Sequence, residues 1–285
     1  MNENMKKFLL CALIAIIGCC FIFACENTEG SSSENPPIPN PSEQKTISKI
    51  IANYGYFEGY CGYYDYTFTY NEHNRVEQIY VVYGDGGKYN RCISIDYDGT
   101  TINISNSQSD SRYSDAVANN LGYITYWENT LFTYNHEGQI INDYYESTSS
   151  SEFGGSKSTI YEWRNDNIES VQCNFGDDRQ YNYKVKYNNK YTNAVNLDLN
   201  WFVDPMNEFG SANVDFELAT IGLMGKRCKN YITELCNASK DFKIIGVRAS
   251  YDWTYDSDGY PIKCEVTEYA SGAEYISTYL FIYSE

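Results

Sequence analysis

Cysteine is the residue type with the widest chemistry in this chain, which contains ten of them. Six lie in its long C-terminal part, at Cys61, Cys92, Cys173, Cys228, Cys236 and Cys264. Exported proteins form disulfides, although the spacing of six cysteines does not resolve their pairing. Cys228 and Cys236 are close enough along the chain to be the predicted pair, with buried free thiols as the alternative. No zinc site is predicted, because this part lacks a Cys-x-x-Cys spacing.

The two histidines, His73 and His136, and the many carboxylates are the other candidates for chemistry. Both histidines lie in turn-like sequences without a recognisable nucleophile, so exposed loop positions are expected. Residues 256–259, Asp-Ser-Asp-Gly, are similar to the start of a calcium loop, but the third acidic position and the distal glutamate are missing. Nothing selects two of the 38 acidic residues as a glycosidase pair. The sequence therefore predicts no catalytic residue, no metal ligand and no cofactor.

Cys25 stands out because it ends an apolar segment near the start of the chain. Lys6 and Lys7 precede an uninterrupted apolar run from Phe8 to Phe23, and polar sequence begins at Glu26. This is the layout of a secretory signal peptide. The run is short for a membrane-spanning helix and no basic cluster follows it, so a permanent transmembrane anchor is the weaker interpretation.

The sequence Ile22-Phe23-Ala24-Cys25 resembles the lipobox of bacterial lipoproteins. In that family the cysteine thiol receives a diacylglyceryl group before the chain is cleaved on its N-terminal side. Residues 16–19, Ile-Ile-Gly-Cys, match the same pattern, but cleavage before Cys19 leaves an apolar mature start, so the apolar-to-polar boundary favours Cys25. The resemblance implies a lipid anchor in the outer membrane, on its periplasmic or its cell-surface face. An unlipidated secretory peptide is the remaining alternative.

The chain therefore divides into three predicted regions: a signal peptide at residues 1–24, a tether at 25–44 and a single domain at 45–285. The tether is built from Glu, Asn, Ser, Gly and Pro, which cannot bury enough apolar surface to order the segment. The remaining length suits one large β domain. The whole chain has a net charge of −17, which excludes a general nucleic-acid binder because such proteins need a basic surface.

The domain is rich in tyrosine, and its aromatic and apolar residues alternate with polar ones. The chain has 30 Tyr and 13 Phe, and tyrosine suits a half-buried pleated surface. Alternation is clearest at residues 64–70, 181–187, 196–203 and 247–255. Each of these segments predicts a strand with one buried face and one wet face.

A hairpin motif also repeats along the domain. Copies occur at residues 68–76, 132–140 and 253–261, with a looser copy at 161–168. In each copy Asn or Asp opens the turn, and a late Gly or Asn lets the chain reverse in a left-handed conformation. Asp98-Gly99 predicts a tighter hairpin over residues 95–102. We therefore predict an all-β antiparallel meander of repeated hairpins that forms a curved sheet or a closed soluble barrel.

One segment interrupts the alternation. Residues 213–224 predict a short helix closed by Gly225. Lys226 and Arg227 would then suit the negative end of the helix dipole.

The repeated aromatic-x-Tyr-Asn/Asp-x-x-Gly hairpins, together with residues 221–230 and 251–261, resemble a family of secreted lipoproteins of Gram-negative gut anaerobes. The family is catalogued as a domain of unknown function with a porin-like fold. The resemblance covers most of residues 45–285 and implies a curved or closed antiparallel β structure. Lys184, Lys186, Arg248 and Asp252 occupy wet-facing positions, which argues against a barrel embedded in lipid.

Two functions of different classes follow. The leading one is a noncatalytic envelope or surface module that binds a glycan or a protein, or has a structural role. Aromatic residues such as Tyr63, Tyr126 and Trp127 would stack on sugar rings where they are exposed. The alternative is a hydrolase acting on polysaccharide or peptide, which requires a deep cleft holding two or more carboxylates with raised pKa values.

Overall fold

The computed structural model describes residues 45–57, 60–84, 90–107, 115–145, 156–176, 179–204, 215–270 and 272–284. Cys19, Cys25 and the predicted signal peptide and tether lie outside the described residues. Within the described part, no helix is both long and apolar enough to cross a membrane.

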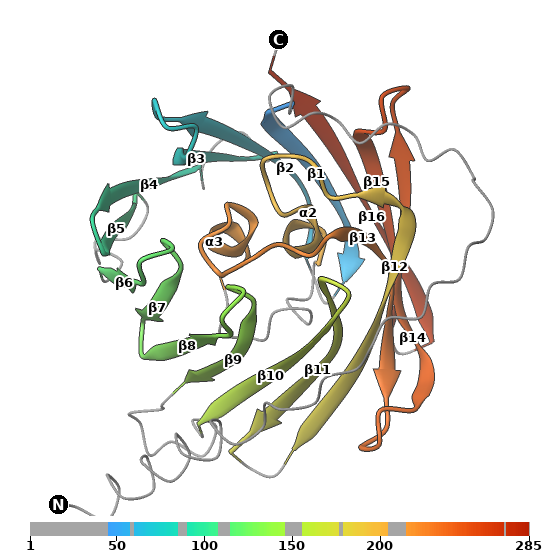
Figure 1. Ribbon diagram of the computed structural model, residues 1–285. Coiled ribbons are helices and arrows are strands. Elements are labelled where there is room, and N and C mark those ends of the chain that lie inside the picture. Colours follow the sequence, from blue (N-terminus) through green and yellow to red (C-terminus); the bar gives the residue numbers. More distant parts are fainter. Residues whose placement is uncertain are drawn as a thin grey trace, which may run out of the picture. The chain divides into compact units, whose positions relative to one another are not determined.

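Sixteen antiparallel strands close into a barrel in the described part of the chain (Figure 1). In chain order they are β1 (Ile47–Phe57), β2 (Tyr60–Tyr70), β3 (Val76–Tyr83), β4 (Arg91–Asp98), β5 (Thr101–Asn106), β6 (Ala116–Ala118), β7 (Ile124–Trp127), β8 (Thr130–Tyr134), β9 (Ile140–Tyr145), β10 (Lys157–Arg164), β11 (Asn167–Phe175), β12 (Gln180–Thr192), β13 (Asn230–Ala238), β14 (Ile244–Tyr255), β15 (Pro261–Ala270) and β16 (Ala273–Tyr283). Each strand pairs with its neighbours in sequence, and β1 also pairs with β16, for example through Ala52 and Tyr279. The predicted all-β antiparallel fold is confirmed, and the sheet closes.

The alternation in the sequence separates a buried apolar interior from an outer wall that carries polar and charged side chains together with exposed apolar ones. On β2, Tyr66 and Phe68 are buried, whereas Thr69 is exposed. Charged pairs join neighbouring strands on the outer wall, and Lys49 Nζ lies 2.7 Å from Asp65 Oδ2. Burying the apolar face of every strand against the interior supplies the main favourable free energy of folding.

The repeated turns share one hydrogen-bond pattern. In each, the side-chain oxygen of the first residue accepts from the backbone N–H groups two and four positions later. These first residues are Asn71, Asn119, Asn135 and Asp256, of which Asn119 is a copy that the repeat search missed. The late residue has a positive φ in every copy, at Asn74, Gly122, Gly138 and Gly259.

The two other predicted hairpins use shorter turns. Gly99 has a φ of 60° between β4 and β5, as the Asp98-Gly99 signal predicted. In the looser copy, Asn165 and Asp166 both have positive φ, which is the geometry of a type I′ hairpin turn.

The segment at residues 196–203 is not a strand, so that prediction is wrong. It contains α2 (Leu199–Phe202), and the chain here is buried on all sides. Its polar positions are inside as well, because Asp198 caps the helix by accepting from Asn200 N–H and Asn200 Oδ1 accepts from Ile232 N–H. The polar positions of this segment are therefore buried residues that hydrogen-bond to the backbone, and they do not form a solvent-exposed face of a strand.

The predicted short helix is α3 (Phe216–Thr220), which begins at Asp215 as its N-cap. Residues 213 and 214 lie outside the described residues, and residues 221–224 form turns. Lys226 and Arg227 do not act at the end of this helix. Lys226 Nζ instead lies 2.8 Å from Asp166 Oδ1, and the Arg227 guanidinium donates to the Val195 carbonyl, so this part of the prediction is wrong.

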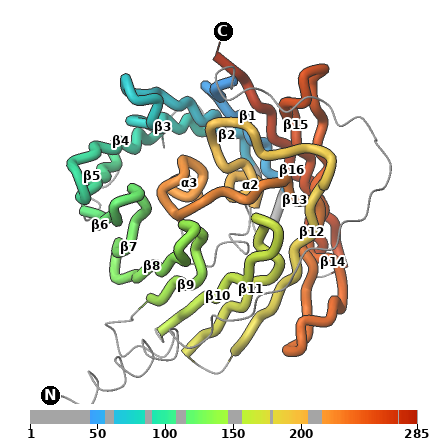
Figure 2. Tube along the Cα trace, in the orientation of Figure 1, coloured from blue at the N-terminus to red at the C-terminus, as the bar shows by residue number. Residues whose placement is uncertain are grey.

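Together α2 and α3 belong to a long connection between β12 and β13, and both helices lie inside the ring of strands (Figure 1, Figure 2). We call the described residues of this connection, 193–204 and 215–229, the plug. The Phe202 ring lies 4.8 Å from that of Tyr66 and 6.0 Å from that of Tyr279, and the Trp201 ring contacts Tyr161. The interior is therefore occupied by the chain itself.

The plug is also hydrogen-bonded to the hairpins at one end of the barrel. Ile124 N–H donates to the Leu223 carbonyl, and Lys226 N–H donates to the Gly138 carbonyl. Lys229 N–H donates to Asp166 in the next hairpin. These bonds attach the plug to three successive hairpins of the wall.

Candidate functional site

The residues that sequence reasoning singled out for chemistry do not assemble into one site. His73 and His136 lie in different hairpin turns, and their side chains are exposed, as expected. In the acidic turn at residues 256–259, Lys45 Nζ lies 2.8 Å from Asp256 and 3.1 Å from Asp258. No group of three or more His, Cys, Asp or Glu side chains that could hold a metal ion occurs among the described residues.

The structure does not bring the predicted cysteine pair together. Cys228 and Cys236 are both buried free thiols. Cys236 lies within β13, and the strand from Asn230 to Cys236 alone spans roughly 20 Å at about 3.3 Å per residue. Disulfides need Cα atoms about 4.4–6.8 Å apart. An extended strand therefore separates these two thiols, a geometry that closeness in sequence does not reveal.

The aromatic residues proposed for ligand stacking divide into two groups. Tyr63 is 45% exposed and Tyr126 is 41% exposed on the outer wall. Trp127 is only 5% exposed and packs in the core, so it is not available to a ligand. Trp127 follows Tyr126 on β7, and successive residues of a strand point to opposite faces.

A charged cluster lies inside the barrel, between the plug and the wall. The Arg91 guanidinium at the start of β4 forms an ion pair with Glu217 on α3, whose side chain is 3% exposed. Burial raises the pKa of Glu217 well above its usual range, and the Asp215 charge raises it further, against the opposing effect of Arg91. Burial also raises the pKa of Asp215. Two carboxyls with raised pKa therefore lie together beside one cation.

Tyrosines surround this cluster. The Tyr54 and Tyr66 hydroxyls lie 3.5 Å apart, and the Tyr64 ring contacts both Tyr54 and Tyr83. Burial raises the pKa of Tyr54 and Tyr66 above the usual value, so both hydroxyls are protonated at neutral pH. The ion pair therefore holds α3 against the wall within an aromatic environment.

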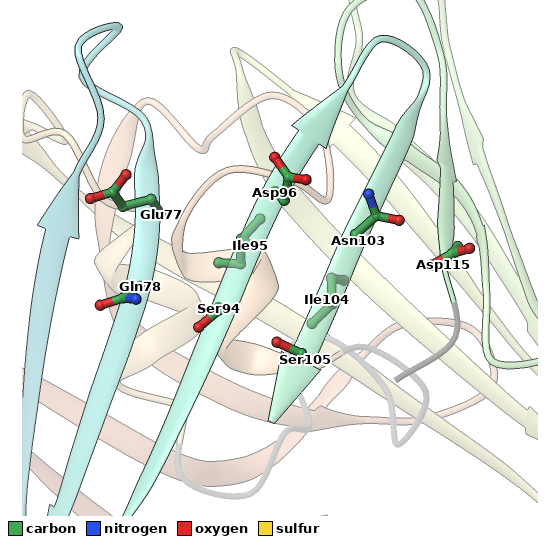
Figure 3. A pocket seen from close by; sticks show the side chains of 9 residues that line it. All are labelled: Glu77, Gln78, Ser94, Ile95, Asp96, Asn103, Ile104, Ser105 and Asp115. Atoms are coloured by element: carbon green, nitrogen blue, oxygen red, sulfur yellow. The ribbon is translucent and has the colours of Figure 1, made fainter. Parts of the chain in front are cut away.

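The outer wall carries a groove of about 510 Å³ over β3, β4 and β5 (Figure 3). Its polar lining consists of Glu77, Gln78, Ser94, Asp96, Asn103, Ser105 and Asp115, and the buried residues Ile95 and Ile104 contribute to its floor. We call this feature the wall groove.

Strand register explains why these side chains meet. Ser94 pairs with Gln78 of β3 on one side and with Ser105 of β5 on the other. Asp96 pairs with Asn103 in the next outward row. Because Ile102 pairs with Ala116, Asp115 lies beside Asn103 at the following position. The tight Asp98-Gly99 hairpin sets this register, so the predicted turn positions most of the groove.

The wall groove can donate hydrogen bonds to an uncharged polar ligand and accept hydrogen bonds from it. Its described lining includes three carboxylates, two amides and two hydroxyls, and no basic side chain. Such a lining suits hydroxyl groups, whereas it repels anions. The sequence signal for the groove was the run of short polar residues at the outward positions of this hairpin, which a search for catalytic motifs passes over.

The same barrel occurs in solved structures of gut bacteria. A structure described as a porin-like protein from Bacteroides uniformis ATCC 8492 matches with a TM-score of 0.55 at 14% identity, covering 85% of this chain and 99% of that one. A porin-like protein from Bacteroides vulgatus ATCC 8482 matches with a TM-score of 0.55 at 14% identity, covering 84% of this chain and 99% of that one. The shared property is the fold. No family model matches the chain, and no curated protein matches it.

Proposed function

We propose that this chain is a lipid-anchored protein of the bacterial envelope whose barrel is a noncatalytic binding module, with its ligand held in the wall groove. The observation that carries the proposal is the position of the groove. It lies on the outer wall, whereas inside the barrel aromatic rings of the plug pack against rings of the wall. A channel or an internal ligand cavity needs the space that Trp201 and Phe202 occupy.

Charged side chains on the outer wall support a barrel surrounded by water. Lys186 Nζ on β12 lies 2.6 Å from Glu234 Oε2 on β13, and Asp252 on β14 is exposed. Transmembrane barrels instead present an apolar band to lipid, and charges there are costly. Attachment to the membrane then depends on the lipid at Cys25. The hairpin resemblance to secreted lipoproteins of gut anaerobes supports the same assignment.

The anchor is tested by labelling cells with radioactive palmitate. We expect label in the wild-type chain and none in Cys25→Ala, with Cys19→Ala as the matched control that keeps the label. Label that persists in Cys25→Ala contradicts the anchor at this residue.

The binding site is tested on the lipidated protein in a detergent without a sugar headgroup, against arrays of glycans and peptides. We expect a ligand whose binding is lost in the double variant Asp96→Ala and Asn103→Ala. Thr254→Ala, an exposed position on β14, is the control and keeps its binding. Absence of any ligand, or a ligand that the groove variant binds as well as the wild type does, contradicts the proposal.

The alternative of a hydrolase would use Asp215 and Glu217, two neighbouring carboxyls whose pKa values burial raises, although Glu217 is paired with Arg91 and its side chain is only 3% exposed. One protonated and one ionised carboxyl is the arrangement that glycoside hydrolysis requires. If this function holds, a polysaccharide or peptide substrate is cleaved by the wild type and not by Glu217→Gln. Equal turnover by both proteins eliminates this site.

A further inference from the structure

The outer wall beside the groove carries a row of exposed apolar and aromatic side chains. Val117, Tyr126, Leu131 and Tyr144 are 48%, 41%, 43% and 38% exposed. Each is paired with the next across neighbouring strands: Val117 with Tyr126, Tyr126 with Leu131, and Leu131 with Tyr144. Directly opposed residues of antiparallel strands have Cβ atoms about 5 Å apart, so these four side chains form one continuous row.

This row continues the wall groove. Asp115 belongs to the groove, and Val117, two positions later, points to the same face of the wall. Val117 also pairs with Thr101 of β5, the strand that supplies Asn103. The polar groove over β3 to β5 and the apolar row over β6 to β9 therefore form one surface, which follows the adjacent strands of the barrel in Figure 1.

The chemistry of this surface matches a sugar chain. A hexose presents hydroxyls at its edges and an apolar C–H face, so one ligand can bond to carboxylates and amides and also stack on aromatic rings. The groove has no basic side chain among its described lining residues, and the whole chain has a net charge of −17. Phosphate, sulfate and uronic acid groups are therefore repelled.

We infer that the outer wall from β3 to β9 binds an uncharged oligosaccharide, with the wall groove engaging its hydroxyls and Tyr126 and Tyr144 stacking under its rings. This inference rests on the proposed function and specifies its ligand class. One strand separates the two tyrosines, which places them roughly 10 Å apart. From Asn103 on β5 to Tyr144 on β9 the surface extends roughly 20 Å at about 4.8 Å per strand. The ligand is therefore an oligomer and not a single sugar.

Isothermal titration calorimetry of the lipidated protein in a detergent without a sugar headgroup tests the inference. The probes are maltohexaose, cellohexaose and mannohexaose, each compared with its monosaccharide, and a hexalysine peptide as the charge-complementary rival. We expect one hexasaccharide to bind, and its monosaccharide to bind far more weakly. Tyr126→Ala and Tyr144→Ala should each weaken binding about tenfold, the usual size for a central contact residue.

Tyr181→Ala is the matched control, because Tyr181 is 46% exposed on β12, outside this surface. All three tyrosines are exposed, so circular dichroism should report an intact fold. The Tyr126 and Tyr144 variants could instead bind with wild-type affinity while the Asp96→Ala, Asn103→Ala double variant loses binding. That result overturns stacking on the tyrosine row and still supports binding in the wall groove. If hexalysine binds and no sugar does, the oligosaccharide assignment is overturned, whereas the proposal that the barrel is a binding module is retained. If no probe binds, the inference is overturned, and the separate array experiment decides the proposed function.

Discussion

Arg91 on β4 and Glu217 on α3 form an ion pair inside the barrel, although 126 positions separate them in the chain. The pair joins the wall to the plug at a point where both side chains are largely removed from water. Removing one partner of a buried pair is costly, because the other charge stays desolvated. The plug is therefore part of the folded barrel, and loss of its contacts should lower the unfolding free energy of the whole domain.

Arg91→Met should destabilise the protein by about 3–5 kcal/mol at pH 7.5, the range for a broken buried pair. The loss of unfolding free energy should be smaller at pH 5. The pKa of Glu217 is already raised by burial, and without Arg91 it rises further, so at low pH the carboxyl is protonated and needs no partner. Urea unfolding at the two pH values measures this difference. An equal loss at both values contradicts the buried-charge explanation.

Asp198 should make stability depend on pH, because burial raises its pKa from 3.8 to about 6. The folded protein then holds this proton more tightly than the unfolded chain does. The stabilisation is fully present below pH 4 and is lost as the pH rises through 6, by about 3 kcal/mol in total.

Asp198→Asn keeps the side-chain oxygen that caps α2 and removes the titration. The difference in unfolding free energy between wild type and variant should therefore change between pH 4 and pH 6 and be constant above pH 7. Asp198→Ala is the control for the lost cap, because Ala offers no acceptor to Asn200 N–H. A difference between wild type and Asp198→Asn that does not vary with pH would show that folding leaves the pKa of Asp198 unchanged.

Gly225 lies where the plug closely approaches the wall. Its φ is +102°, and an added Cβ would lie 2.9 Å from the Gly138 carbonyl oxygen and 2.8 Å from Tyr134 Cε1. Gly225→Ala should therefore cost about 3 kcal/mol or more, from the left-handed backbone and a contact with backbone that cannot move cheaply. Gly222→Ala is the matched control, since its φ is +85° and an added Cβ there meets nothing within 4 Å. It should cost only about 1 kcal/mol. Equal losses in thermal unfolding contradict the close approach.

Asn135 should stabilise its hairpin, because its side-chain oxygen accepts hydrogen bonds from the backbone N–H groups of Glu137 and Gln139. Asn135→Ala should cost about 1–2 kcal/mol, whereas Asn135→Asp keeps the acceptor and should cost much less. Thermal unfolding of the two variants gives the comparison, and equal losses would show that the side-chain oxygen contributes little.

Local features of this fold could be predicted from sequence, and contacts between distant segments could not. The hairpins at Asn71, Asn135 and Asp256 have their turn residues next to one another in the chain, so their sequence defines them. The buried helix α2 was predicted as a strand because Asp198 and Asn200 have the spacing of a wet face, although their partners lie in the plug and in β13. Whether a polar residue faces water depends on tertiary contacts that the pattern does not contain.

The candidate site likewise combines features that the sequence predicts with features that depend on tertiary contacts. Tyr126 could be named from its residue type, but its exposure and the burial of neighbouring Trp127 depend on the direction of β7. The wall groove needs the register of Gln78, Ser94 and Ser105 across three strands, which no single segment defines. The Asp98-Gly99 turn is a sequence signal for the pairing of Ser94 with Ser105, but the pairing of Ser94 with Gln78 has no such signal.

The central claim is that the ligand binds to the outer wall and not to the interior. An amide NMR titration of deuterated, 15N-labelled protein with the hexasaccharide that binds tests it most directly. We expect the largest shift changes at the outward positions of β3 to β9, around Asp96, Asn103, Tyr126 and Tyr144. Largest changes at Tyr54, Tyr66 and Glu217, with an unchanged outer wall, would contradict it.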